Sequence, residues 1–168
     1  VNNNGTITNT GAGNATTTIS AVIGTNVTGV IQNSATSQLT LSGANTFTGG
    51  VTIKSGTVLG TSAAANAFGN GGTITLGDTT GTASATLLVG TTGLTYANPI
   101  ALATNATVGT LTIGNSGTAI SATFSGGVTL SAGTLNINGV KAIGVGTFTI
   151  SAGTIDNTSG TSVTLSTN

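Results

Sequence analysis

Only four side chains in this 168-residue chain carry a charge at neutral pH, and any acid–base chemistry would depend on them. They are two carboxylates, Asp78 and Asp156, and two amines, Lys54 and Lys141. The chain has no His to serve as a general base and no Cys to serve as a nucleophile or metal ligand. The many Ser and Thr hydroxyls therefore have no evident activating partner.

The surroundings of the four charged residues indicate turns rather than sites. Asp78 lies in the stretch Gly-Asp-Thr-Thr-Gly, where an Asp commonly accepts hydrogen bonds from nearby backbone N–H groups. A calcium ion is the alternative ligand, but one carboxylate with backbone carbonyls would bind it only weakly. Asp156 is interpreted in the same way, and Lys54 and Lys141 as solvated turn residues. The sequence predicts no metal site and no cofactor.

The composition excludes several classes of partner. Charged residues make up 2% of the chain, whereas about 25% is usual in soluble domains, and the net charge is zero. No basic surface is available for nucleic acid or for an anionic membrane surface. No run of 18 apolar residues exists, so we expect no membrane insertion of this segment.

The remaining composition describes strands and turns. The chain contains 39 Thr and 37 Val, Ile and Leu residues, which favour pleated, half-buried surfaces, and 28 Gly for the turns. The helix-favouring residues Glu, Lys, Arg, Met and Gln are almost absent. Large aliphatic side chains with only four Phe and one Tyr suit a long, thin core better than a round one.

Internal repeats indicate how the strands are arranged. Residues 47–58 and 124–135 are identical at seven of twelve positions, at an offset of 77, and residues 129–135 return as 149–155, at an offset of 20. Three short strands with their turns fill about 20 residues, one coil of a parallel β-helix. The sequence therefore predicts an all-β fold, a right-handed parallel β-helix (β-solenoid) of about eight coils of roughly 20 residues. The larger offset then corresponds to nearly four coils.

Local patterning agrees with this arrangement. Apolar residues alternate with Thr, as in residues 51–53 and 128–130, so that one side of each strand can face the interior of a coil. Hairpins are compatible with the same alternation, and the shorter of the two repeats is what favours coils. We expect a single β-solenoid segment over residues 1–168, with the clearest repeats at 39–76 and 111–168.

Stacked coils also bear on catalysis. Asp78 and Asp156 are 78 positions apart, which predicts about four coils, or roughly 19 Å along the axis. Carboxylate pairs that hydrolyse glycosidic bonds lie about 5–9.5 Å apart. The sequence therefore predicts that the chain is not an enzyme and has no catalytic, cofactor-binding or metal residues.

Three sets of uncharged residues are candidates for binding or stabilisation. Phe47, Phe124 and Phe148 occupy repeat positions, either as core residues or as aromatics that stack on sugars. Asn45, and Asn136 with Asn138, are candidates for side-chain ladders along the coils. The third set comprises Thr-x-Thr pairs, which could form an ice-binding rank if they align on one face: Thr6/Thr8, Thr73/Thr75, Thr110/Thr112 and Thr147/Thr149.

One segment resembles a known family. Residues 39–58 read Leu-Thr-Leu-Ser-Gly-Ala-Asn-Thr-Phe-Thr-Gly-Gly-Val-Thr-Ile-Lys-Ser-Gly-Thr-Val. This stretch resembles the autotransporter-associated β-strand repeat, with Phe47 at a usual Tyr and Val51 at a usual Thr. The resemblance implies a passenger-type parallel β-helix that is displayed outside a bacterial cell, and it carries no catalytic residues.

These observations predict a structural or adhesive extracellular β-solenoid. It would be a surface fibre or passenger segment, secreted and associated with the cell surface. We expect it to belong to a longer repetitive chain or filament, since solenoid ends expose unpaired backbone groups and a near-zero net charge does not oppose association. The expected partners are neighbouring solenoid segments or identical subunits, and a surface carbohydrate. The alternatives are the ice-binding solenoid and a β-helix that binds or processes polysaccharide.

Overall fold

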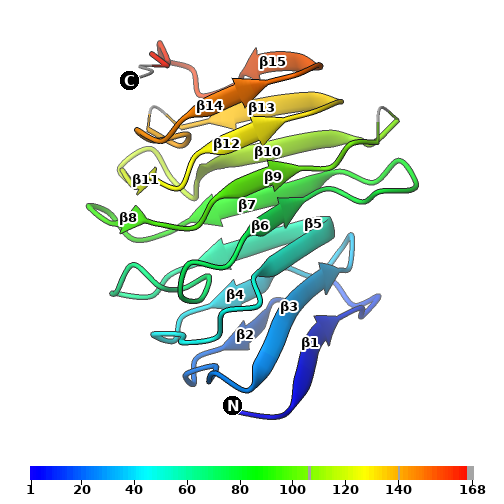
Figure 1. Cartoon of the computed structure of the whole chain (residues 1–168), viewed down its shortest axis with the longest axis vertical. Coiled ribbons are helices and arrows are strands. Elements are labelled where there is room, and N and C mark those ends of the chain that lie inside the picture. Colours follow the sequence, from blue (N-terminus) through cyan, green and yellow to red (C-terminus); the bar gives the residue numbers. More distant parts are fainter. Residues whose placement is uncertain (106, 140, 166–168) are drawn as a thin grey trace.

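The computed structural model describes residues 1–105, 107–139 and 141–165, and within these residues it contains strands and turns but no helix (Figure 1). The strands are β1 (Gly5–Asn9), β2 (Thr17–Ile19), β3 (Val27–Asn33), β4 (Leu39–Leu41), β5 (Val51–Gly60), β6 (Ile74–Leu76), β7 (Ala85–Val89), β8 (Thr95–Tyr96), β9 (Ile100–Leu102), β10 (Thr110–Asn115), β11 (Thr123–Phe124), β12 (Val128–Leu130), β13 (Thr134–Asn138), β14 (Phe148–Ile150) and β15 (Thr154–Asn157).

The strands form the walls of a solenoid, and every pairing is parallel. Sheet A consists of β1, β3, the first half of β5, β6, β9, β12 and β14. Sheet B consists of β2, β4, the second half of β5, β7, β10, β13 and β15. A short third sheet joins β8 to β11. Figure 1 shows the turns stacked from the N-terminus at one end to the C-terminus at the other. The prediction of an all-β parallel solenoid is therefore confirmed.

The number and the length of the turns differ from the sequence prediction. The solenoid has about seven turns rather than eight, because many turns are longer than the predicted coil. The pairing of Val128 with Phe148 spans a turn of the predicted length, whereas the pairing of Val58 with Leu87 spans a turn about half as long again. The additional residues lie in the loops between strands, which carry no repeat that the sequence could reveal.

Register shows which sequence repeat was interpreted correctly. The shorter repeat, of residues 129–135 at 149–155, corresponds to one turn, since Thr129 pairs with Thr149. The longer repeat, of residues 47–58 at 124–135, spans three turns instead of nearly four. Its strands are linked by the pairs Val51–Ile74, Ile74–Ile100 and Ile100–Val128. The longer turns in the middle of the chain account for the difference.

One apolar core runs through the solenoid. Alternate residues of each strand point inward and stack in columns on the equivalent residues of the next turn, as Ile53 does on Leu76, both fully buried. The corner within β5 is made by Gly56, whose φ of +75° suits glycine, and Gly133 has the same φ between β12 and β13. The Ser-Gly pair at residues 55–56 and the Ala-Gly pair at residues 132–133 thus form corners of the solenoid.

Candidate functional site

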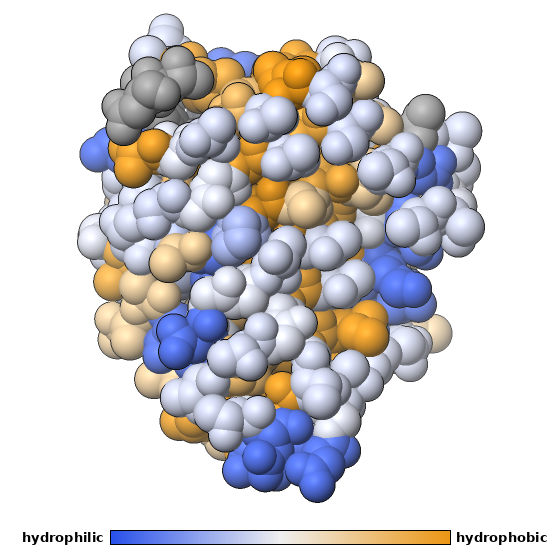
Figure 2. All heavy atoms as spheres, in the orientation of Figure 1, coloured by the Kyte–Doolittle hydropathy of each residue, from blue (hydrophilic) through white to orange (hydrophobic). Residues whose placement is uncertain are grey.

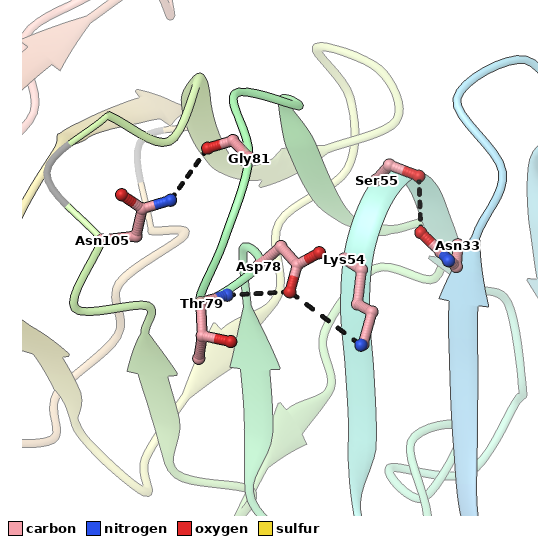
Figure 3. Close-up of polar contacts among 7 residues, drawn as sticks. All are labelled: Asn33, Lys54, Ser55, Asp78, Thr79, Gly81 and Asn105. Atoms are coloured by element: carbon pink, nitrogen blue, oxygen red, sulfur yellow. Dashed lines mark hydrogen bonds and ion pairs between the residues drawn. The ribbon is translucent and has the colours of Figure 1, made fainter.

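The charged side chains do not converge. Lys54 lies in β5 rather than in a turn, and its Nζ is 3.9 Å from Oδ1 of Asp78 in the next turn (Figure 3). Because both side chains are partly exposed, such a pair contributes only about 0–1 kcal/mol. Lys141 is exposed in a turn, as predicted, and Asp156 lies on β15 in sheet B.

The two carboxylates are far from each other. Asp78 follows β6 in sheet A, and Asp156 lies three turns further along in sheet B, instead of the four coils that were predicted. Three turns correspond to about 14 Å along the axis, which still exceeds the separation of a glycosidase pair. Each carboxylate accepts a hydrogen bond from the N–H of the next residue, Thr79 or Asn157, at 2.8 Å. The interpretation of both as acceptors for backbone N–H groups is therefore confirmed.

Polar side chains near Asp78 connect neighbouring turns (Figure 3). Ser55 Oγ donates to Asn33 Oδ1 at 3.3 Å, and Asn105 Nδ2 donates to the Gly81 carbonyl at 2.8 Å. These contacts are stabilising bridges between turns rather than a converging set of groups. Among the described residues, no three His, Cys, Asp or Glu side chains lie close enough together to hold a metal ion.

The aromatic residues form part of the core. Phe47 and Phe124 are fully buried, which confirms the core interpretation and leaves neither ring free to stack on a sugar. Phe148, in the last turn, is only partly buried. Phe124 also belongs to a cluster that the sequence analysis missed, together with Phe68 and Tyr96, and the ring centroids are 5.1–6.0 Å apart.

The aromatic cluster has a sequence signal that was overlooked. Phe68, Tyr96 and Phe124 follow each other at equal intervals along the chain, and Tyr96 pairs with Phe124 in the next turn. The hydroxyl of Tyr96 is buried and has no hydrogen-bond partner among the described residues. Burial raises the pKa of Tyr96 to about 12.

The candidate Asn residues bridge turns but do not stack on each other. Asn45 is fully buried; its Oδ1 accepts from the Ile23 N–H and its Nδ2 donates to the Ala67 carbonyl, so that it joins three successive turns. Asn136 donates to Thr112 Oγ1 and accepts from Thr158 Oγ1. These bridges replace the predicted amide ladders, and Asn138 is exposed at the end of β13.

The Thr-x-Thr pairs do not form a single rank. Thr6/Thr8, Thr73/Thr75 and Thr147/Thr149 lie on or beside sheet A, whereas Thr110/Thr112 lies in sheet B. Within sheet A, Ala101 separates Thr75 from Thr129, and Ile31 separates Thr8 from Thr52. The regular hydroxyl spacing that ice binding needs is therefore interrupted in sheet A, and the remaining pair lies on the other sheet.

The C-terminal end of the solenoid exposes residues of the inward columns. Ile150 pairs with Leu130, and Ile155 pairs with Leu135. The two Leu are fully buried, whereas Ile150 is 51% exposed and Ile155 is 39% exposed, because no described turn covers them. Figure 2 shows hydrophobic residues at this end of the molecule. We call these two Ile residues, together with the partly buried Phe148, the C-terminal face.

The N-terminal end is built differently. Near its start, the inward column that ends at Ile150 contains Gln32, which is fully buried and pairs with Asn9 of the first turn. Gln32 Oε1 accepts from Asn9 Nδ2 at 2.8 Å, and its own Nε2 donates to the carbonyls of Ser34 and Ser37. Figure 2 shows hydrophilic residues at this end. Hydrogen bonds thus replace apolar packing in this column, whereas Ile7 and Ile19 of the first turn pack against the core and are partly buried.

The chain matches no family model, no curated protein and no solved structure. The likeness of residues 39–58 to the autotransporter-associated repeat thus remains a resemblance in sequence. In the part of the chain that the structure describes, no helix is long and apolar enough to cross a membrane.

Proposed function

We propose that this chain is a non-catalytic structural segment of an extracellular fibre, a right-handed β-solenoid whose C-terminal face is covered by a further solenoid turn. The turn would come from a neighbouring segment or an identical subunit at the cell surface. Right-handedness follows the strong preference of connections between parallel strands. The observation that carries the proposal is the exposure of Ile150 and Ile155 in columns whose preceding residues are buried.

Exposure of this kind is costly for an isolated molecule. Burying a large aliphatic side chain contributes about 1.5–3 kcal/mol, and the last turn leaves much of this contribution unused. The outer edges of β14 and β15 also leave backbone groups without a parallel partner among the described strands, which is a template for another strand. A further turn in the same register would bury the side chains and pair the strands together.

The chemistry of the surface supports the same proposal. Asp156 is the single charged residue in the last two strands, and the chain has no net charge. Electrostatic repulsion therefore opposes stacking very little.

The resemblance to a passenger repeat supports the extracellular part of the proposal. Residues 39–58 begin at β4 and end within β5, with Phe47 fully buried between these strands. This arrangement is compatible with a repeat whose role is to form one turn of a β-helix.

Sedimentation velocity at increasing protein concentration tests the proposal. We expect the wild-type chain to form a concentration-dependent series of assemblies. Replacing both Ile residues of the C-terminal face, Ile150→Lys with Ile155→Lys, should give a monomer, because a further turn would bury two unpaired ammonium groups.

Thr149→Lys is the matched control, because Thr149 directly precedes Ile150 in β14 and its side chain is exposed on the outer side of the strand. This variant adds a charge to the same strand and should still assemble. A wild-type chain that stays monomeric at every concentration, or a double variant that assembles as well as the control, would contradict the proposal.

A further inference from the structure

Three Asn-Gly pairs occur in the chain, at residues 4–5, 70–71 and 138–139. In such a pair the backbone nitrogen of the glycine can attack the side-chain amide carbon of the asparagine, since glycine has no Cβ atom to hinder the approach. The reaction ends with a carboxylate in place of the amide. It requires a backbone that is free to bring the two atoms together, so the fold determines which of the three pairs can react.

Two of the pairs are held by the sheets. Gly5 belongs to β1 and pairs with the first residue of β3. Asn138 belongs to β13 and pairs with Gly114 of β10. Gly139 is closely packed, because a Cβ atom there would lie 2.7 Å from Nδ2 of Asn115. Ring closure at either pair would therefore require a strand to separate from its neighbour.

The third pair lies outside the strands, in the connection between β5 and β6 on the flank of the stack (Figure 1). Asn70 and Gly71 are both exposed. Among the described residues, the N–H of Gly71 has no backbone hydrogen-bond partner, and a Cβ atom at this position would meet no other atom within 4 Å. The nitrogen that must attack is therefore neither paired nor enclosed.

The chain is anchored on both sides of this peptide. The N–H of Asn70 donates to the Phe47 carbonyl of the preceding turn at 2.8 Å. Gly72 is packed against the same turn, where its Cβ atom would lie 2.5 Å from the nitrogen of Gly50. Gly71, with a φ of +78°, has the conformational freedom of glycine between these two anchors. The peptide can therefore rotate without the loss of a strand pairing.

We infer that Asn70 is a site of spontaneous modification, at which the side-chain amide is converted to a carboxylate. The nitrogen of Gly71 forms a bond to Cγ of Asn70 and gives its proton to water, while Nδ2 leaves as ammonia. Water then opens the cyclic imide at one of its two carbonyl carbons. The product is an aspartate, or an isoaspartate in which the main chain passes through the former side-chain carbonyl. The solvent is the only co-reactant.

The modification changes the electrostatics of the molecule. The unmodified chain has no net charge, so each conversion leaves the chain with one net negative charge. The new carboxylate lies on the flank of the stack, away from the C-terminal face. Like charges on the flanks would oppose side-by-side contact between copies and leave the ends unaffected. This inference is independent of the stacking of solenoid ends.

Peptide mass spectrometry of the chain during incubation at mildly alkaline pH tests the inference. In the folded chain we expect conversion at Asn70 to be at least about tenfold faster than at Asn138, because the strand pair must first open locally. In urea the two sites should react at similar rates, since both are followed by glycine. Conversion at Asn70 that is no faster than at Asn138 in the folded chain would overturn the inference.

Two glycine variants test the role of the backbone. Gly71→Ala should slow conversion at Asn70 about tenfold, because a Cβ atom hinders the attacking nitrogen. Gly93→Ala is the matched control: Gly93 also has a positive φ, of +76°, and open space around its Cβ position, and it does not follow an asparagine. It should convert at the wild-type rate. An unchanged rate in Gly71→Ala would overturn the assignment of the attacking group.

Isoelectric focusing separates this outcome from the stacking proposal. The incubated wild-type chain should gain an acidic band that coincides with Asn70→Asp, and Asn70→Gln should form much less of it. Asn70→Gln should also sediment like the wild-type chain, since its C-terminal face is intact. An acidic band of equal intensity in Asn70→Gln would contradict the inference, whatever the assembly state of the protein.

Discussion

Each end of this solenoid has a last turn that no described turn covers, and the two ends differ in the residues that they place there. In the first turn the inward position Asn9 is hydrogen-bonded to the buried Gln32, while Ile7 and Ile19, in other inward columns, are partly buried. The last turn meets solvent with Ile150 and Ile155, in columns that hold buried Leu residues in the preceding turn. The comparison shows that the apolar surface exposed at an end depends on the type of residue in its inward columns as well as on the position of the turn. Polar contacts occupy one inward column at the N-terminal end, whereas the C-terminal end exposes Ile150 and Ile155 in its inward columns.

The largest expected effect distinguishes a covered column from an uncovered one. Leu130→Ala should lower the free energy of unfolding by about 2–5 kcal/mol, because it leaves a cavity in a packed core. Ile150→Ala, its partner in the next turn, should cost much less in a monomer, since Ile150 is 51% exposed. Urea unfolding of both variants measures the difference. Equal losses at low protein concentration would show that the last turn is covered.

The next effect concerns the N-terminal end. Gln32→Leu preserves bulk but removes the Nε2 donor of the Ser34 and Ser37 carbonyls and leaves Asn9 Nδ2 with only Ser37 Oγ, at 3.4 Å. We expect a loss of about 1–3 kcal/mol in urea unfolding, with assembly unchanged. If the polar contacts at this end contribute nothing, Gln32→Leu will instead be as stable as the wild-type chain or more stable.

A smaller effect concerns the middle turns, which neither end disturbs. The pKa of Tyr96 is raised by burial to about 12, above its ordinary value of 10.0, so the folded chain holds the phenol proton more tightly than the unfolded chain does. The contribution of the protonated Tyr96 to the free energy of unfolding is fully present below pH 10, and it is lost as the pH rises from there toward 12. Thermal unfolding of wild type and Tyr96→Phe across this range should show a shallower alkaline decline in the variant. Parallel curves would contradict it.

The smallest expected effect lies on the surface. Lys54→Met removes the ion pair with Asp78, in which both side chains are partly exposed. We expect the free energy of unfolding to change by about 1 kcal/mol or less. Chemical unfolding at low and at high salt measures it. A loss as large as that of Leu130→Ala would mean that this pair stabilises the stack as a core residue does.

The sequence predicted the parts of the fold that depend on local pattern. Alternation of Thr with aliphatic residues located the first half of β5 and β12, and the repeat at residues 149–155 predicted the pairing of the last two turns. Both depend on periodicities, of two residues along a strand and of one turn along the axis. Such periodicities can be read without coordinates.

The rest depends on loops and on contacts between turns. Turns differ in length, as the pairs Val128–Phe148 and Val58–Leu87 show, and the loops that vary have no repeating pattern. For this reason neither the turn count nor the separation of the two Asp residues could be predicted correctly. A pocket at the end of β10 likewise depends on Asn115 meeting Gly139 and a loop two turns away. Nothing in the local sequence distinguishes this Asn from the many others.

Negative-stain imaging of the assembled chain tests the central claim most directly. A single solenoid of about seven turns is about 34 Å long, since parallel strands lie ~4.8 Å apart. Because the C-terminal face is open, we expect rods several times longer than this, with the width of one solenoid. Isolated particles no longer than one solenoid at every concentration would contradict the account.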